Sequence, residues 1–149
     1  MDSIQESAQT VPVAGDSEVL VCGGGPAGVA AAIAAARAGA STRLIEMHGA
    51  LGGIWTIGAM AHVCGMHASK GGILREIQGT LKARGAVGLS ERTFDVESTK
   101  LLLEELCLRA GVRVRLHTRV AGVVRAEANR LAAVVTESKS GREAWKARV

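Results

Sequence analysis

The stretch EVLVCGGGPAGVAAAIAAARAGASTRLIE, residues 18–46, decides the fold of this chain. Its first apolar run, residues 19–21, is typical of a strand that is buried on both faces. A G-x-G-x-x-G pattern follows, and an alanine-rich helix then runs from Pro26 toward Gly39, a residue type that commonly ends helices. A second apolar run over residues 42–45 completes the pattern. The stretch therefore predicts a βαβ unit with two parallel strands.

Each glycine of this pattern has its own steric role in dinucleotide binding. Gly23 permits the tight turn, Gly25 lets the backbone approach a pyrophosphate, and Gly28 lets the helix pack closely on the strand. Pro26 suits the first helical turn because its missing N–H leaves no bond unmade. We expect the amides of Ala27 and Gly28 to bind the phosphates at the positive end of the helix dipole.

Glu46 follows the second strand, where the adenosine ribose of a dinucleotide lies. Its carboxylate would accept hydrogen bonds from the ribose hydroxyls and would repel a 2′-phosphate. The glycine pattern alone is weak evidence in a chain with 19 glycines. The glycine pattern here lies between a strand and a helix, and an acid follows the next strand at the spacing of the fingerprint. This combination predicts a dinucleotide site rather than a structural glycine turn.

The composition excludes several classes of protein. The 149 residues correspond to one domain at most, and 48% hydrophobic with 21% charged residues is ordinary for a globular domain. The net charge is +4, but aromatic residues make up only 2%, which argues against a nucleic-acid partner. Residues 1–17 are polar and aperiodic, and they predict a disordered tail without a signal peptide. No stretch resembles a membrane span, and three cysteines fit a reducing, cytoplasmic location.

A second glycine pair follows soon after the second strand, in the sequence LGGIWTIG of residues 51–58. Together with VCGGGPAGVAAA at residues 21–32 and LIE at residues 44–46, it resembles the FAD-dependent oxidoreductases of the glutathione-reductase-like superfamily. The resemblance implies FAD as the cofactor. It also implies that the backbone at Gly52 and Gly53 passes close to the pyrophosphate and ribityl chain, although a plain flexible turn is the alternative.

Further roles in FAD binding follow from the same resemblance. Thr56 would form a hydrogen bond near the flavin, and the main chain at Val120 would hold the adenine. Met47 stands at a cofactor-binding position where many relatives have Arg or Lys. A cationic contact is therefore not expected at Met47.

The segment AHVCGMH, residues 61–67, brings His62, Cys64 and His67 close together in sequence. They are the only local candidates for catalysis, and three interpretations remain open. The residues could bind a metal such as zinc, but a fourth ligand is missing, and we expect no metal site. The loop could face the flavin or the substrate, with His62 or His67 as proton donor. The third interpretation is a polar loop without chemistry.

The later part of the chain predicts two helices, a further strand and an antiparallel meander. The residue patterns favour helices over 71–85 and 95–110, and strands over 112–116, 122–126, 130–136 and 143–149. Arg113 and Arg115 share one face of the strand they occupy, which indicates either a solvated face or an anionic partner. Cys22 and Cys107 are expected to be small buried residues.

The predicted fold class is α/β, with a Rossmann-type (FAD/NAD(P)-binding) parallel sheet and an antiparallel β-meander over residues 18–149. The resemblance implies a further Ala-Thr-Gly strand and a substrate domain, so the chain is expected to be the truncated N-terminal part of a flavoenzyme, inactive alone. That enzyme would transfer hydride or electrons between FAD, a small-molecule substrate and an unknown electron acceptor. Two alternatives remain: an NAD-binding Rossmann domain of a dehydrogenase and a non-catalytic remnant.

Overall fold

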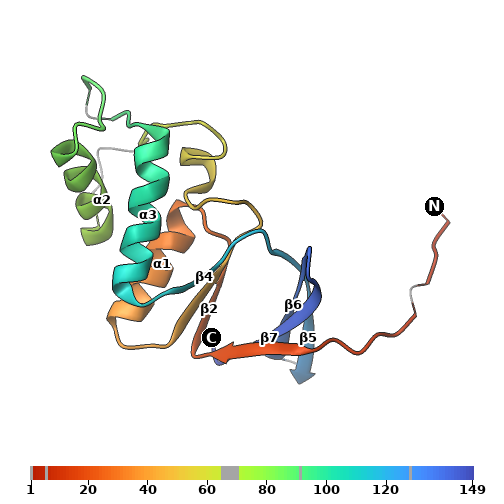
Figure 1. Cartoon of the computed structure of the whole chain (residues 1–149). Coiled ribbons are helices and arrows are strands. Elements are labelled where there is room, and N and C mark those ends of the chain that lie inside the picture. The colour runs from red at the N-terminus through yellow and green to blue at the C-terminus, as the bar shows by residue number, and fades with distance from the viewer. Residues whose placement is uncertain (1, 6, 65–70, 91, 128) are drawn as a thin grey trace.

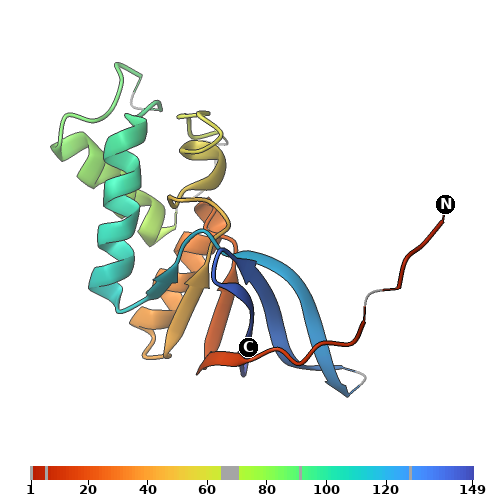
Figure 2. The same ribbon diagram turned by 45° about the vertical axis from the view of Figure 1, so that its right-hand side comes forward.

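The computed structural model describes residues 2–5, 7–64, 71–90, 92–127 and 129–149. Helices lie on one side of a parallel sheet and a second sheet lies on the other (Figures 1 and 2). The elements are β1 (Val13–Ser17), β2 (Val19–Cys22), α1 (Pro26–Arg37), β3 (Thr42–Ile45), η1 (Gly53–Trp55), α2 (Gly72–Ala83), α3 (Val96–Ala110), β4 (Arg113–Arg115), β5 (Arg119–Glu127), β6 (Arg130–Ser138) and β7 (Gly141–Ala147). No helix in these ranges is long and apolar enough to cross a bilayer.

The parallel sheet confirms the predicted βαβ unit. Its strand order is β2-β3-β4, and all neighbouring strands run parallel. Apolar residues on the helix-facing side of this sheet pack against α1 and α3, and Ile33, Leu44 and Leu102 are completely buried there. The many alanines of α1 leave little side-chain bulk, so the helix can lie close to β2 and β3.

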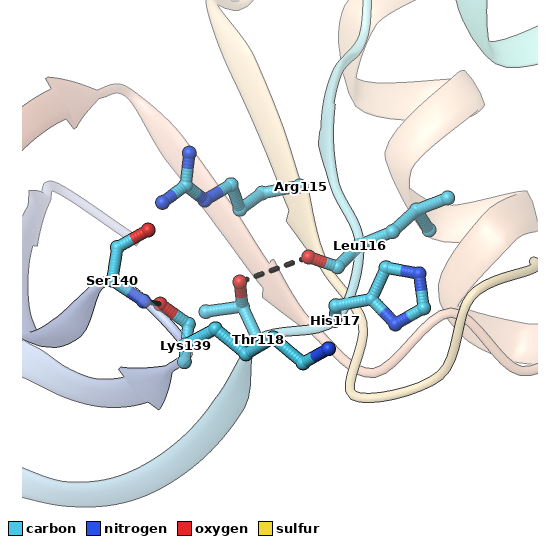
Figure 3. Close-up of a pocket in the computed structure, with 7 residues that line it drawn as sticks. Arg115, Leu116, His117, Thr118, Lys139 and Ser140 are labelled. Carbon is cyan, nitrogen blue, oxygen red and sulfur yellow. Dashed lines mark hydrogen bonds between the residues drawn. The ribbon is translucent and has the colours of Figure 1, made fainter.

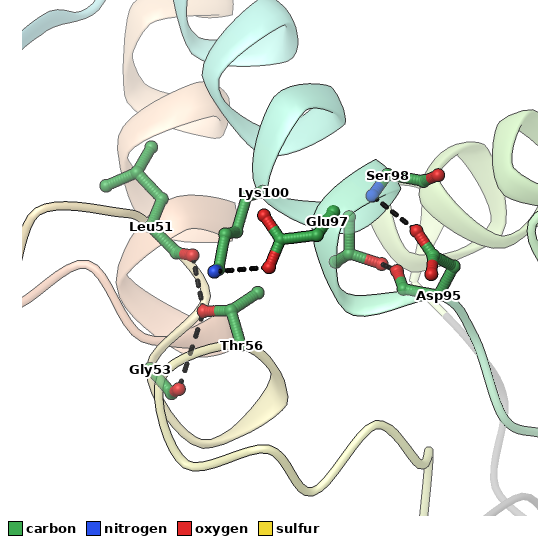
Figure 4. A network of polar contacts seen from close by, with 8 residues as sticks. Leu51, Gly53, Thr56, Asp95, Glu97, Ser98 and Lys100 are labelled. Atoms are coloured by element: carbon green, nitrogen blue, oxygen red, sulfur yellow. Dashed lines mark hydrogen bonds and ion pairs between the residues drawn. The ribbon is translucent and has the colours of Figure 1, made fainter.

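The ends of α3 follow from local chemistry that the sequence predicted. The Asp95 carboxylate accepts a hydrogen bond of 2.7 Å from the Ser98 amide, which caps the helix (Figure 4). That bond holds the pKa of Asp95 below its usual value. At the other end Gly111 adopts a φ of 83°, a left-handed conformation that suits glycine.

The predicted disordered tail is wrong for its last five residues, because Val13–Ser17 forms β1. This strand pairs in parallel with β7, and Gly15 lies opposite Trp145. A Cβ atom at Gly15 would lie 3.3 Å from the Trp145 ring, so the strand approaches the indole because position 15 has no side chain. Its partner strand lies far along the chain, and VAGDS has no alternation of its own to indicate a strand.

Trp145 connects the two sheets. Its ring is almost completely buried, and the guanidinium of Arg43, from β3, lies 4.3 Å from the ring centroid. Arg115, from β4, lies 5.9 Å from the same centroid. The indole N–H donates a hydrogen bond of 2.9 Å to the hydroxyl of the buried Thr136. The stacking of the Arg43 and Arg115 guanidinium groups on Trp145 thus attaches the meander to the parallel sheet, and the buried hydrogen bond to Thr136 holds the indole in place within the meander.

Arg113 and Arg115 bind this chain itself, rather than only solvent or an external anion. Arg113 donates to the carbonyl oxygen of Asp16 at 3.0 Å, and Arg115 forms an ion pair of 2.9 Å with Glu143. Burial, followed by the charges of these two arginines, holds the pKa of Arg43 below its usual value. The arginines of β3 and β4 therefore belong to the interface between the sheets.

We predict that Thr136→Val lowers the free energy of unfolding by about 1–3 kcal/mol, because the Trp145 N–H would be buried without an acceptor. Thr136→Ser keeps the hydroxyl and serves as the matched control, with a smaller loss. Urea unfolding followed by circular dichroism measures both. Equal losses in the two variants would mean that the methyl group, and not the hydrogen bond, matters at this position.

Candidate functional site

The glycine-rich turn between β2 and α1 is packed as tightly as the sequence predicted. Gly23 has a φ of 107°, and a Cβ atom at Gly28 would lie only 1.9 Å from the Gly23 carbonyl oxygen. A Cβ atom at Gly25, in contrast, would meet nothing within 4 Å. Gly28 is therefore required by the packing of the protein itself, whereas the space at Gly25 is open to a ligand.

The first turn of α1 presents its amides without a competing side chain. Gly25 is the N-cap residue, no side chain caps the helix, and Pro26 occupies the first turn. The Gly25 carbonyl oxygen accepts the first intrahelical bond, 2.9 Å from the Val29 amide. The preceding amides, including those of Ala27 and Gly28, have no acceptor within the helix, which is the arrangement that binds phosphate at helix N-termini.

Glu46 lies directly beside this turn, at the end of β3. The Glu46 residue is 5% exposed, and its carboxylate accepts two backbone hydrogen bonds, from Gly24 at 2.5 Å and from His48 at 2.8 Å. Glu46 therefore holds the glycine-rich turn against the segment that follows β3. Sequence reasoning missed this second task, since the fingerprint assigns the acid only to the ribose.

The second glycine pair packs against the first. The Gly52 amide donates a hydrogen bond of 2.7 Å to the Gly24 carbonyl oxygen, and a Cβ atom at Gly53 would lie 2.9 Å from the Gly25 Cα. Both residues have positive φ angles, 107° and 51°. The two glycine-rich segments thus contact each other through backbone atoms, with no side chain between them. A plain flexible turn would not require glycine for such a contact. This contact places Gly52 and Gly53 directly beside the turn at Gly24 and Gly25.

The hydroxyl of Thr56 serves the loop itself. It donates a hydrogen bond of 2.6 Å to the Leu51 carbonyl oxygen, and the Thr56 side chain is buried (Figure 4). The bond closes the loop behind Gly52 and Gly53. A hydrogen bond from Thr56 to a flavin stays a prediction, because the proton of this hydroxyl is already used.

Met47 and Val120 lie apart from the glycine contacts. The Met47 side chain is 55% exposed, immediately after Glu46. Val120 belongs to β5, pairs with Thr136 and is 38% exposed. It lines a hollow of about 960 Å³ between β2 and the meander, together with Leu20.

The His–Cys segment lies only partly within the described residues. His62 forms an isolated antiparallel bridge with Thr93, and the Cys64 side chain is exposed. His67 lies outside the described residues, so the structure does not test the three-residue cluster. Within the described ranges, no group of three or more His, Cys, Asp or Glu side chains could hold a metal ion.

The remaining cysteines differ in exposure. Cys22 is exposed, which contradicts its prediction as a buried residue, because the face of β2 on which it lies borders the 960 Å³ hollow. Cys107 is buried as predicted, and its burial, with a smaller effect of the Glu104 charge, raises the pKa of the thiol to about 11.

We predict that Ellman's reagent at pH 8 gives two rapid phases, the faster from Cys64 and the other from Cys22, because partial burial raises the pKa of the Cys22 thiol, and one slow phase from Cys107. Burial blocks the reagent, and a thiol with a pKa of about 11 has little thiolate at that pH. All three thiols should react in denaturant. The Cys107→Ala variant should retain both rapid phases, and three equally fast thiols in the native chain would contradict the packing of α3.

We further predict that Gly28→Ala destabilises the chain by about 1–3 kcal/mol, because its methyl group would overlap the Gly23 carbonyl oxygen. Gly25→Ala, with open space and an ordinary φ of −66°, should cost less, about 0.5–1 kcal/mol for replacing an N-cap glycine by alanine. Chemical denaturation of both variants tests the difference. Equal stability would refute the close packing of α1 on the turn.

The comparisons with known proteins agree with this geometry. No curated protein sequence matches the chain. Among solved structures, THI4 of Thermovibrio ammonificans has a TM-score of 0.61 at 20% identity, over 89% of this chain and 55% of that one. A geranylgeranyl bacteriochlorophyll reductase-like protein of Thermoplasma acidophilum has a TM-score of 0.60 at 27% identity, over 89% and 37%.

The myxobacterial chondrochloren halogenase CndH, described as a variant of the FAD-dependent halogenases, has a TM-score of 0.67 at 17% identity over 89% of this chain. The chain spans 36% of CndH, so it corresponds to about a third to a half of these structures. The family model of the FAD dependent oxidoreductases matches residues 18–149. The chain therefore belongs to the FAD dependent oxidoreductase family.

Proposed function

We propose that the glycine-rich turn and Glu46 hold the ADP half of FAD. The observation that supports this most strongly is the contrast between Gly28, where no Cβ fits, and Gly25, where a Cβ would meet open space at an uncapped helix N-terminus. The amides of Ala27 and Gly28 would bind the pyrophosphate, and the Glu46 carboxylate would accept the ribose hydroxyls.

Glu46 can hold the ribose only if its carboxylate accepts hydrogen bonds from the ribose hydroxyls as well as from the backbone amides. Each of its oxygens accepts one backbone amide, and a carboxylate has about four acceptor positions in total. The remaining positions are available to ribose hydroxyls without breaking the bonds to Gly24 and His48. The residues present therefore fit the adenosine ribose of FAD.

Gly52 and Gly53 would border the pyrophosphate from the side opposite α1, and Thr56 would keep their loop closed. Val120 would hold the adenine through its main chain, and Met47 would contact the adenosine as an apolar residue, not as a cation. When bound, FAD supplies hydride or electron transfer. The described residues bind and orient it and exclude water from its phosphates.

The whole enzyme would act on a small-molecule substrate and pass electrons to a separate acceptor. The chain spans 36–55% of its structural neighbours, and β2 lies at the edge of the described parallel sheet. We infer that residues 18–149 form the N-terminal part of the FAD-binding domain and have no turnover alone. His62, Cys64 and His67 stay candidates for proton transfer. Three free thiols support a reducing location, the cytoplasm.

Calorimetric titration of the 149-residue chain with ADP, FAD and FMN tests the assignment. ADP and FAD should bind, whereas FMN, which lacks the adenosine, should not. Gly25→Val should abolish binding of both nucleotides with an unchanged circular dichroism spectrum, because the new side chain would fill the pyrophosphate position. An ADP affinity unaffected by Gly25→Val would overturn the proposed site.

We predict that Glu46→Ala weakens ADP binding by one to two decades, since a charge-assisted hydrogen bond contributes about 1.5–3 kcal/mol. Glu137→Ala removes an equal charge from the meander and should leave the affinity unchanged. If both substitutions weakened ADP binding equally, the lost affinity would come from the change in net charge and not from a contact with the ribose.

A further inference from the structure

A smaller hollow of about 260 Å³ lies between the segment that follows β4 and the turn that joins β6 to β7 (Figure 3). Three of its lining side chains are basic, three carry hydroxyl groups, and none of the lining residues that the structure describes is acidic. The lining residues are Arg115, Leu116, His117, Thr118, Ser138, Lys139 and Ser140. We call this hollow the basic pocket.

Lys139 gives the basic pocket an uncompensated charge. Its side chain extends beneath Thr118 toward His117 (Figure 3), and it forms no ion pair or hydrogen bond with the part of the chain that the structure describes. Arg115 is different, because Glu143 binds one of its guanidinium nitrogens at 2.9 Å. The positive charge that remains available therefore comes mainly from Lys139, with the imidazole of His117 nearby.

Two of the hydroxyl groups of the basic pocket have protons free to form hydrogen bonds, which favours a ligand that carries acceptor atoms. The Ser138 oxygen accepts a hydrogen bond of 3.1 Å from the Ser140 amide, which leaves the Ser138 hydroxyl proton free to donate. The Ser140 hydroxyl has no partner within the described residues. Thr118 already donates to the Leu116 carbonyl oxygen at 2.9 Å (Figure 3). Two hydroxyl donors and one ammonium group thus line the same hollow, and none of its described lining residues carries a negative charge.

The wall of the basic pocket is fixed by backbone hydrogen bonds. The Thr118 amide donates to the Glu46 carbonyl oxygen at 2.9 Å, and the His117 amide donates to the His48 carbonyl oxygen at 3.1 Å. The His117 ring packs against Gly49, where a Cβ atom would lie 2.6 Å from the ring. A ligand would therefore meet a wall that is already ordered, which lowers the entropic cost of binding.

We propose that the basic pocket binds a phosphomonoester dianion. A phosphomonoester presents three strong acceptor oxygens in different directions, and the lysine, the histidine and the serines approach from different sides. A lysine ammonium binds phosphate as a point charge and needs no planar partner. The pocket contains none of the glycine-rich residues, so it is separate from the pyrophosphate position at α1.

Titration of the ¹⁵N-labelled 149-residue chain with inorganic phosphate, at constant ionic strength, tests the proposal by amide chemical shifts. The amides of residues 115–118 and 138–140 should shift and saturate. Lys139→Gln should weaken this response about tenfold, as expected for one charge-assisted contact. Lys146→Gln is the matched control, because Lys146 is exposed on β7, outside the basic pocket, and its loss changes the net charge equally.

Three results would overturn the proposal: equal weakening in the two lysine variants, shifts confined to residues 25–28, or an equal affinity for acetate. The Gly25→Val variant separates the basic pocket from the proposed FAD site. A response of residues 138–140 that persists in Gly25→Val supports an independent site, whatever that substitution does to ADP binding. Loss of the response in a folded Gly25→Val chain would count against it.

Discussion

The buried carboxylate of Glu46 is the constraint on which the geometry of this chain depends. The carboxylate of a residue that is 5% exposed must have its acceptor positions filled, and the amides of Gly24 and His48 fill two of them. These two bonds fix the end of β3 to the turn on one side and to the following segment on the other. The same side chain thereby determines how the glycine-rich turn is oriented, and in the proposed function it also determines where a ribose would lie.

Close contacts between backbone atoms also hold the glycine-rich turn in place. The turn at Gly23–Gly25 is contacted by the start of α1 and by the loop at Gly52 and Gly53, and at each contact a Cβ atom would lie within 3 Å of a neighbouring atom. Backbone groups held this closely have few alternative conformations. A cofactor that binds them meets amides already in position, so less of its binding energy is lost to ordering the protein.

The sequence predicted the central βαβ unit, both ends of α3 and the strands of the meander because each depends on local signals. Alternation, glycine position and capping residues such as Asp95 are read over a few neighbouring positions. The sequence did not reveal β1, the exposure of Cys22 or the arginine–tryptophan contacts between the sheets. Those features depend on which distant segment lies opposite, and no short pattern in VAGDS or around Arg43 specifies that.

The candidate site likewise contains residues whose roles the sequence predicts and residues whose contacts it did not reveal. The fingerprint predicts binding roles for Gly25, Gly28 and Glu46 from their spacing alone. It did not reveal that Thr56 binds its own loop, or that Lys139 and His117 face a common space. These residues come from segments whose approach is set by tertiary packing, and a lysine in a turn is ordinarily a solvated surface residue.

The pairing of β1 with β7 has a consequence for how the chain folds. The two strands are separated by roughly 130 residues and the paired strands β2 and β3 by roughly 23, so pairing β1 with β7 costs about 1.5 kcal/mol more in chain entropy. Contacts of such long range form slowly and are made late. During synthesis the glycine-rich turn can therefore assemble while residues 13–17 remain unpaired, and the indole of Trp145 covers the arginines of β3 and β4 only after these strands have formed.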